Sequence, residues 1–283
     1  EIRSYMHPRR TTEPAALKDF AESVALSAGR LVRKKWSEPR EISEKGYRDL
    51  VTDADIASQA LITRTIRTAF PDHGFLTEED DPSLPDDGPI IWVIDPVDGT
   101  SNYSRQVPTY CVSIGAVIPG QADGNGHRHY QPVAGAIYDP MRDELFSAAA
   151  GGPSMLNGRI IAVSQINNMD RAIISMDWSR DFRRRERLLS VLGRVGHQAH
   201  TIRATGSASL TLAWVAAGRF DVYFNFGMSP WDVVAAAVII AQAGGLVTNI
   251  SGTPWKLDDA TCVASNKLLH TTFLTQAELS DQA

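Results

Sequence analysis

Residues 92–103 read WVIDPVDGTSNY, and this stretch decides how the rest of the chain is interpreted. Its apolar start predicts a strand that ends in two carboxylates, Asp95 and Asp98. Gly99 and Thr100 follow, and a glycine lets the backbone turn tightly against a ligand. A helical turn beginning there would offer free N–H groups to an anion. Carboxylates at this spacing suit a hard cation such as Mg²⁺, whereas the plainer alternative is an aspartate-rich surface turn.

Further acidic residues lie on both sides of this stretch. The segment DLVTDAD at 49–55 places Asp55 in the first turn of a helix, where it either caps N–H groups or orients a hydroxyl or water. Glu78 follows a short apolar stretch, and a solvated acidic loop is its plain alternative. Asp232 and Ser207 stand at predicted helix starts, where simple capping competes with a ligand contact.

The first 150 residues predict two helices followed by an antiparallel sheet. The first helix is amphipathic, with Thr12 as its cap and Pro14 in its first turn. The second spans 53–70, capped by Asp53 and ended by Pro71. Strands are expected at 90–94, 112–118, 133–138 and 144–148, with loops at 77–89 and 119–132.

From about residue 151 the pattern alternates between strands and helices, which predicts an α/β half. Strands are expected at 172–176, near 202, at 221–226 and near 247, and helices at 183–195, 207–217 and 232–243. We therefore expect an N-terminal part, residues 1–150, with helices and an antiparallel sheet, and a C-terminal α/β part, residues 151–283. The site should lie between them, with Asp95, Asp98 and Asp232 converging.

The composition is that of an ordinary globular protein, 43% hydrophobic and 22% charged. Lys and Arg number 28 against 33 Asp and Glu, a net charge of −5, so no overall positive field would hold nucleic acid or an anionic membrane. No apolar run reaches the roughly 20 residues that span a bilayer, and the first residues lack the apolar core of a secretory signal. Cys111 and Cys262 lie far apart without metal-binding spacing, so we expect a reducing compartment, the cytoplasm.

The order of the motifs is more specific than any one of them. D-L-V-T-x-x-D at 49–55, F-x-x-E-E at 75–79, W-V-I-D-P-V-D-G-T-x-N at 92–102 and W-D-x-x-A at 231–235, with a later A-G-G, follow one another along the chain. This order resembles that of the inositol monophosphatases, magnesium-dependent and lithium-sensitive enzymes, from about Leu17 to beyond Gly245. The resemblance implies an α-β-α-β-α layered sandwich shared with fructose-1,6-bisphosphatase, and a homodimer.

The resemblance also implies a ligand set for two Mg²⁺ ions and a weaker third one. The first ion would be held by Glu78, Asp95 and the backbone carbonyl of Val97. The second would be held by Asp95, Asp98 and Asp232, and the third would lie near Glu78 and Glu79. Carboxylates crowded in this way raise one another's pKa values unless cations neutralise them, so the chemistry agrees with the resemblance.

Other residues would act on water and substrate. The resemblance implies that Asp55 and Thr100 orient and deprotonate the attacking water, beside Glu78. The residues implied to contact the substrate are Asp98, Gly99, Thr100, Ser101, Gly206, Ser207, Ala208, Asn225 and Asp232. Two ions roughly 3.5–4 Å apart neutralise the phosphoryl oxygens, acidify the water and stabilise the leaving oxygen, so no nucleophilic side chain is required.

Thr77, Gln59 and Asn225 are among the positions that depart from the family pattern. Thr77 stands where the family usually has glycine, and we expect an ordinary extended conformation there. Gln59 stands where a glutamate is common, away from the proposed ligands. Asn225 stands where inositol-specific members carry a glutamate, and an amide both donates and accepts without carrying a charge. The substrate is therefore not fixed as inositol phosphate.

The resulting expectation is a phosphomonoesterase that hydrolyses a small phosphate ester with metal-activated water. Inositol monophosphate, histidinol phosphate, a sugar phosphate and fructose 1,6-bisphosphate are the candidate substrates. A haloacid dehalogenase phosphatase, with a covalent aspartyl phosphate, is disfavoured because Pro96 and Val97 both separate the two aspartates, where that motif has one residue. A non-catalytic interaction protein on the same fold remains the alternative from another class.

Overall fold

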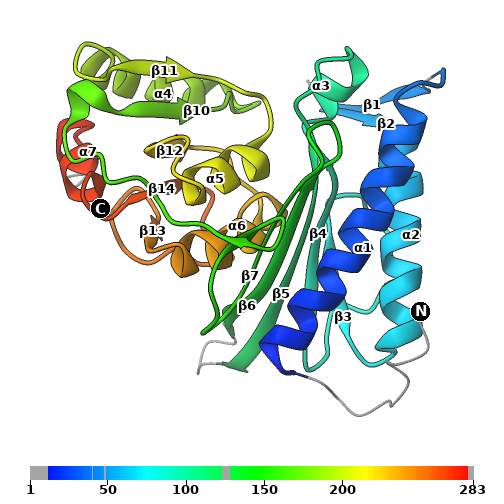
Figure 1. Cartoon of the computed structure of the whole chain (residues 1–283). Helices are drawn as coiled ribbons and strands as arrows, with labels where there is room; N and C mark the ends of the chain where they lie inside the picture. Colours follow the sequence, from blue (N-terminus) through cyan, green and yellow to red (C-terminus); the bar gives the residue numbers. More distant parts are fainter. Residues whose placement is uncertain (1–11, 40, 48, 123–127, 280–283) are drawn as a thin grey trace.

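The structure, a computed structural model, describes residues 12–39, 41–47, 49–122 and 128–279. Its helices and sheets alternate in five layers (Figure 1). Helices α1 (Pro14–Lys35) and α2 (Asp53–Ala69) cover the outer face of a large sheet, and α5 (Ala208–Ala216) and α6 (Pro230–Gln242) lie between it and a second sheet. The far face of the second sheet carries α4 (Phe182–Val195) and α7 (His270–Gln276). The predicted α-β-α-β-α sandwich is confirmed.

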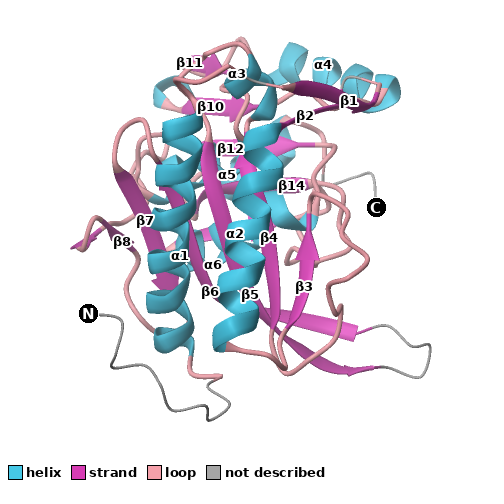
Figure 2. Ribbon diagram, turned by 90° about the vertical axis from the view of Figure 1, so that its right-hand side faces the viewer, coloured by secondary structure: helices cyan, strands magenta, loops and turns pink. Residues whose placement is uncertain are grey.

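The outer helices have the predicted positions but different caps. Glu13, not Thr12, is the N-cap of α1, and Pro14 occupies its first turn as expected. Thr52, not Asp53, is the N-cap of α2, because its side chain accepts from the N–H of Ala54 while Asp55 accepts from the backbone of Thr52. This capping box is what turns Asp55 back toward the end of the large sheet. Figure 2 shows both helices lying along the sheet.

Within the described residues, the large sheet has the strand order β3-β4-β5-β6-β7-β8-β9. Its strands are β3 (Gly74–Thr77), β4 (Ile91–Asp98), β5 (Cys111–Ala122), β6 (Arg128–Asp139), β7 (Glu144–Ala149), β8 (Met155–Leu156) and β9 (Arg159–Ile160). All neighbours are antiparallel except β3 and β4, which run parallel. Thr77 lies in β3, which confirms its expected extended conformation.

Two glycines of the large sheet let α6 approach it closely. A Cβ added at Gly115 would lie 2.5 Å from a side-chain methyl of Val234, and one added at Gly135 would collide with the backbone carbonyl of Ala235. Since both contacted residues lie on α6, the backbone of this helix rests directly on the sheet. This contact places the N-terminus of α6 beside the end of β4.

The second sheet, among the described residues, has the order β11-β10-β12-β14-β13. Its strands are β10 (Ile173–Met176), β11 (Thr201–Arg203), β12 (Val222–Asn225), β13 (Gly245–Thr248) and β14 (Cys262–Asn266). Strand β10 runs parallel to β11 and β12, whereas β14 runs antiparallel to β12 and β13. A short helix, α3 (Thr100–Ser104), follows β4, and a 3-10 turn, η1 (Met169–Arg171), precedes β10.

Several elements were not predicted. The hairpin of β1 (Ile42–Gly46) and β2 (Asp49–Thr52) lies on the surface, and every β1 residue is exposed, so no apolar alternation marks it. Strand β14 and helix α7 were also missed. The predicted loop at 119–132 is wrong at its ends, because β5 and β6 extend into it, and residues 123–127 lie outside the described chain. The division at residue 150 stays a prediction.

None of the helices in the described part of the chain combines the length and the apolar character that a membrane crossing needs.

Candidate active site

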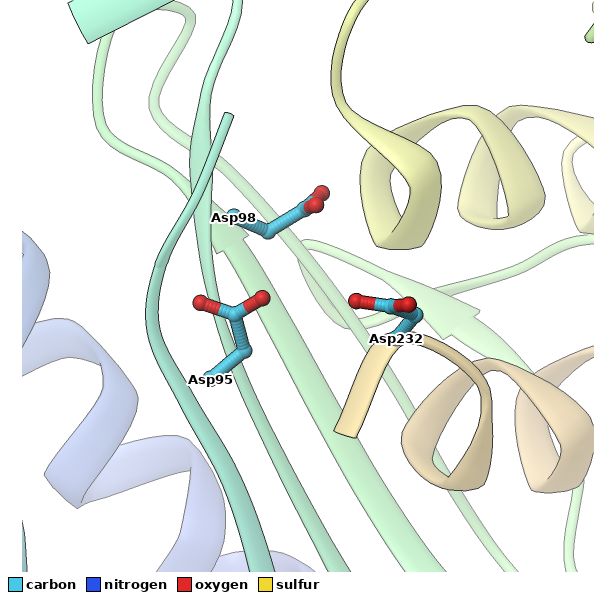
Figure 3. Close-up of side chains that lie close together, drawn as sticks. All are labelled: Asp95, Asp98 and Asp232. Atoms are coloured by element: carbon cyan, nitrogen blue, oxygen red, sulfur yellow. The ribbon is translucent and has the colours of Figure 1, made fainter. Parts of the chain in front are cut away.

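Three carboxylates converge where the large sheet meets the middle helices (Figure 3). Asp95 and Asp98 come from the end of β4, and Asp232 comes from the first turn of α6. One ligand atom from each lies within 4.8 Å of the others. Such a separation is short enough for all three side chains to share one cation or a pair of cations.

A break in the strand pairing puts Asp95 and Asp98 on one side of β4. Residues three apart in a regular strand point to opposite faces. Here Asp95 pairs with Ser113 and Asp98 with Cys111. Strand β4 therefore has one residue more than β5 over this interval, which is a β-bulge. The bulge contains Pro96, which has no N–H to give to the ladder, and the N–H of Val97 instead donates to Asp95 Oδ1 at 3.0 Å.

Asp98 is held by the N-terminus of α5, which brings a distant loop to the site. The Ser207 hydroxyl donates to Asp98 Oδ2 at 2.5 Å, and the Ala208 N–H donates to Oδ1 at 3.1 Å. Of the two alternatives for Ser207, capping by its side chain does not occur: Ser207 occupies the N-cap position, but its side chain makes no capping bond within α5. Asp98 takes that place and complements the positive end of the helix. A contact between Ser207 and the substrate stays a prediction.

Asp232 lies inside the first turn of α6 rather than at its boundary. The helix begins at Pro230, two residues earlier than predicted, and Ser229 is its N-cap. Asp232 Oδ2 accepts from the N–H of Ser229 at 2.8 Å, which closes a capping box. This bond fixes the direction of the carboxylate, and one oxygen of Asp232 points toward Asp95 and Asp98 (Figure 3).

Asp55 and Thr100 form the pair that the resemblance implied. The Thr100 hydroxyl lies 3.0 Å from Asp55 Oδ1 and 3.1 Å from the carbonyl oxygen of Val97. The Asp55 carboxylate also accepts from the hydroxyl and the N–H of Thr52. Burial raises the pKa of Asp55 to about 6, and these hydrogen bonds oppose the rise. A carboxylate with such a pKa is suited to accepting a proton near neutral pH.

Glu78 lies beside the three carboxylates. Its N–H donates to the carbonyl of Ile94 at 3.1 Å, which continues the parallel pairing of β3 with β4. Burial raises the pKa of Glu78 to about 7, while Lys45 and a hydrogen bond with Asp95 lower it. The Lys45 amine, on the β1–β2 hairpin, lies 3.6 Å from Glu78 and 2.5 Å from Glu79. No motif pointed to Lys45, and only the folded hairpin brings it here.

The turn after Asp98 and the loop before α5 interlock. Gly99 has φ 99°, a left-handed conformation that favours glycine, and a Cβ there would lie 3.0 Å from the carbonyl of Thr109. Asn102 donates to the carbonyls of Thr109 and Thr205 at 2.8 Å each. Gly206, with φ 79°, packs against the same Asn102 amide. The turn that contains Ser101 and the loop that precedes Ala208 are thus held against each other beside Asp98.

The second sheet contributes Asn225 and a residue that the motifs did not indicate. Asn225 ends β12 and is 5% exposed, with both ends of its amide bonded inside the protein. Asp177 follows β10, beside it, and accepts from the N–H of Gly206 at 2.7 Å. The sequence could have indicated Asp177, because it directly follows the strand predicted at 172–176. Ligands of α/β sheets bind at the carboxyl ends of parallel strands.

The carboxylates repel one another. Burial raises the pKa values of Asp95, Asp98 and Asp232, and the charges of Glu78 and Asp98 raise that of Asp95 further. A divalent cation would neutralise the repulsion between these carboxylates. The ligand atoms that they offer are hard oxygens, as Mg²⁺ requires. The residues therefore fit a magnesium site, formed by these three aspartates with Glu78 and the Val97 carbonyl.

Comparison with known proteins agrees with the geometry. A sequence model described as the inositol monophosphatase family matches residues 13–282. The Nus factor SuhB of Salmonella typhimurium is 34% identical over 283 aligned residues, 98% of each chain. The inositol-1-monophosphatase of Synechocystis sp. is 34% identical over 254 residues, 89% of this chain and 85% of that protein.

Solved structures give the same result. An inositol monophosphatase from Anabaena superposes with a TM-score of 0.79 at 34% identity, covering 93% of this chain and 96% of that one. An extragenic suppressor protein SuhB from Bartonella henselae superposes with a TM-score of 0.84 at 29% identity, covering 95% and 100%. The chain belongs to the inositol monophosphatase family.

Proposed function

We propose that this protein is a Mg²⁺-dependent phosphomonoesterase that acts on a small phosphate ester. The observation that carries the proposal is the convergence of Asp95, Asp98 and Asp232, whose ligand atoms lie within 4.8 Å of one another. Bound Mg²⁺ would supply Lewis acidity toward the phosphate and the attacking water. Two ions suit this ligand set. A third ion near Glu78 would have to displace the Lys45 amine, 3.6 Å from that carboxylate.

Thr100 and Asp55 are proposed to handle the proton of the attacking water. The Thr100 hydroxyl donates to Asp55 and therefore presents its lone pairs to a water on the other side. Thr100 accepts a hydrogen bond from that water and fixes its direction, and Asp55 receives the proton through the same hydroxyl. General acid–base assistance of this kind contributes about 10²- to 10⁴-fold in rate.

The remaining site residues are proposed to surround the ester. The turn of Gly99, Thr100 and Ser101 would receive phosphate oxygens, close to Asp98. The alcohol would lie on the opposite side, toward the second sheet. The residues assigned to that side are Gly206, Ser207, Ala208, Asn225 and Asp232.

A phosphate-release assay tests the proposal. The purified protein is assayed with Mg²⁺ over inositol, histidinol, sugar and nucleotide phosphates, and again after chelation with EDTA. We expect turnover of at least one small ester, lost with EDTA and restored by Mg²⁺. Asp95→Asn serves as the matched inactive control. Absence of turnover across the panel, or turnover unaffected by EDTA and by Asp95→Asn, would refute the proposal.

A binding role beside catalysis is the second candidate. Relatives named Nus factor SuhB suggest this role. Helix α4 also exposes large apolar side chains on its surface. Phe182 is 72% exposed and Leu189 is 54% exposed, among several arginines. A stoichiometric partner that is retained by Asp95→Asn and lost by Phe182→Ser would support this role. The homodimer implied by the resemblance is a separate proposal, tested by light scattering.

A further inference from the structure

Asp177 and Asn225 stand side by side at the carboxyl ends of two parallel strands. Strands β10 and β12 pair with Met176 opposite Phe224, so the next residues along each strand are Asp177 and Asn225. This edge faces the loop at 205–208, whose Ser207 hydroxyl is bonded to Asp98. A substrate whose phosphate lies at Asp98 would extend its alcohol along this edge.

Asn225 has little capacity left to recognise a substrate. Its Nδ2 donates to the hydroxyl of Tyr223 at 3.1 Å, and its Oδ1 accepts from the N–H of Gly227 at 2.9 Å. Only 5% of the residue is exposed. Both ends of the Asn225 amide are therefore occupied by bonds to nearby residues. A ligand would have to compete with these two internal hydrogen bonds to reach the amide.

Asp177, in contrast, keeps acceptor capacity. Oδ1 accepts from the N–H of Gly206 at 2.7 Å, and Oδ2 accepts from the hydroxyl of Tyr223 at 3.3 Å. The N–H of Thr205 also donates to this carboxylate. An ionised carboxylate offers about four acceptor positions, so about one remains open. The residue is half-buried rather than enclosed. The same Tyr223 hydroxyl joins Asp177 to Asn225, which fixes the carboxylate in its orientation.

We propose that Asp177 is a specificity-determining residue: it accepts a hydrogen bond from a hydroxyl or ammonium group on the alcohol part of the substrate. This inference rests on the proposed phosphatase function and deepens it. The substrate class is then a phosphate ester of a polyol or an amino alcohol, as opposed to an ester whose alcohol has no second donor. The Asp177 carboxylate supplies the negatively charged hydrogen-bond acceptor that the Asn225 amide does not offer.

Matched substrates and matched variants test this role. Myo-inositol 1-phosphate and cyclohexyl phosphate share a ring and differ in the hydroxyls, and histidinol phosphate supplies an ammonium. Asp177→Asn removes the charge but keeps an oxygen for the N–H of Gly206. Asp181→Asn is the control, because it removes a neighbouring charge while asparagine caps α4 as well as aspartate does.

The expected result is a loss confined to donor-bearing esters. Asp177→Asn should lower kcat/KM for the better of myo-inositol 1-phosphate and histidinol phosphate about ten- to a hundredfold. It should leave cyclohexyl phosphate within about threefold, and Asp181→Asn should leave all three unchanged. Which of the two donor-bearing esters leads identifies the donor as hydroxyl or ammonium.

Other outcomes would overturn the inference. An equal loss of kcat/KM for cyclohexyl phosphate would mean that Asp177 supports the 205–208 loop and does not recognise the alcohol part of the substrate. No loss on any ester means that Asp177 does not contact it. Wild-type protein that hydrolyses cyclohexyl phosphate as well as the donor-bearing esters contradicts the inference without any variant. Wild-type protein that hydrolyses no ester overturns the proposed function itself, which distinguishes the two failures.

Discussion

Asp98 accepts a hydrogen bond of 2.5 Å from the hydroxyl of Ser207, which follows it by 109 positions in the chain. The bond joins the end of β4 to the start of α5, so a loop of the second half orients a carboxylate of the first. The N–H of Ala208 adds a second bond to the same carboxylate. The proposed binding of a metal ion at Asp98 would therefore depend on the packing of α5 against the large sheet.

Ser207→Ala should weaken Mg²⁺ binding more than it slows turnover. Loss of the donor raises the pKa of Asp98, so protons compete better with the metal. We expect the Mg²⁺ concentration for half-maximal activity to rise about tenfold at pH 6 and less at pH 8, since a bond to a charged group contributes about 1.5–3 kcal/mol. Ser209→Ala is the control, because its hydroxyl contacts the Asp232 backbone carbonyl and no carboxylate.

Asp95→Asn should abolish turnover while the protein stays folded. The amide is isosteric, but it removes charge from the ligand proposed to serve both ions, and the loss of several kcal/mol of transition-state stabilisation lowers kcat about a hundredfold or more. The metal-free variant should melt no lower than wild type, because one source of repulsion within the cluster is gone. Near-normal kcat at saturating Mg²⁺ would contradict the bridging role.

Thr100→Ala should lower kcat about a hundredfold, with little change in the Mg²⁺ requirement. Its hydroxyl is bonded to Asp55 and to the Val97 carbonyl and is not among the proposed metal ligands. Thr100→Ser keeps the hydroxyl and should retain most activity. Parallel loss in both variants, measured with Mg²⁺ titrations of initial rate, would show that the methyl group and not the hydroxyl matters.

Stability of the metal-free protein should fall as pH rises from about 4 to 7. Burial raises the pKa of Asp55 to about 6 and that of Asp177 to about 7. Both lie above their unfolded values, so the folded state binds more protons in this window, and the stability present at low pH is lost as pH passes the folded values, by an order of a few kcal/mol. Thermal melts in EDTA measure it. Asp177→Asn should flatten the profile, and an equally steep profile in that variant would contradict the assignment.

The proposed metal ligands could be named from the sequence because they lie in short motifs with a fixed order, and the structure brings three of them, Asp95, Asp98 and Asp232, together. The layered fold was implied by the family resemblance that the same motifs carry, and it is confirmed. The sequence could not predict the bulge that puts Asp95 and Asp98 on one face, since that depends on pairing with β5. Asp177 and Lys45 were missed for a related reason: each reaches the site through contacts with residues 29 or more positions away. Local sequence patterns do not reveal contacts between residues that lie so far apart in the chain.

The close contact of α6 with Gly115 and Gly135 has a consequence for how variation affects this protein. Neither residue has a functional group or touches a candidate ligand, yet a single added methyl at either would push against the backbone or side chains of the helix that carries Asp232. Coordination tolerates displacements of only a few tenths of an ångström. Inherited or engineered alanines at these two positions would therefore abolish the proposed activity without touching the site, with every proposed metal ligand still present in the sequence.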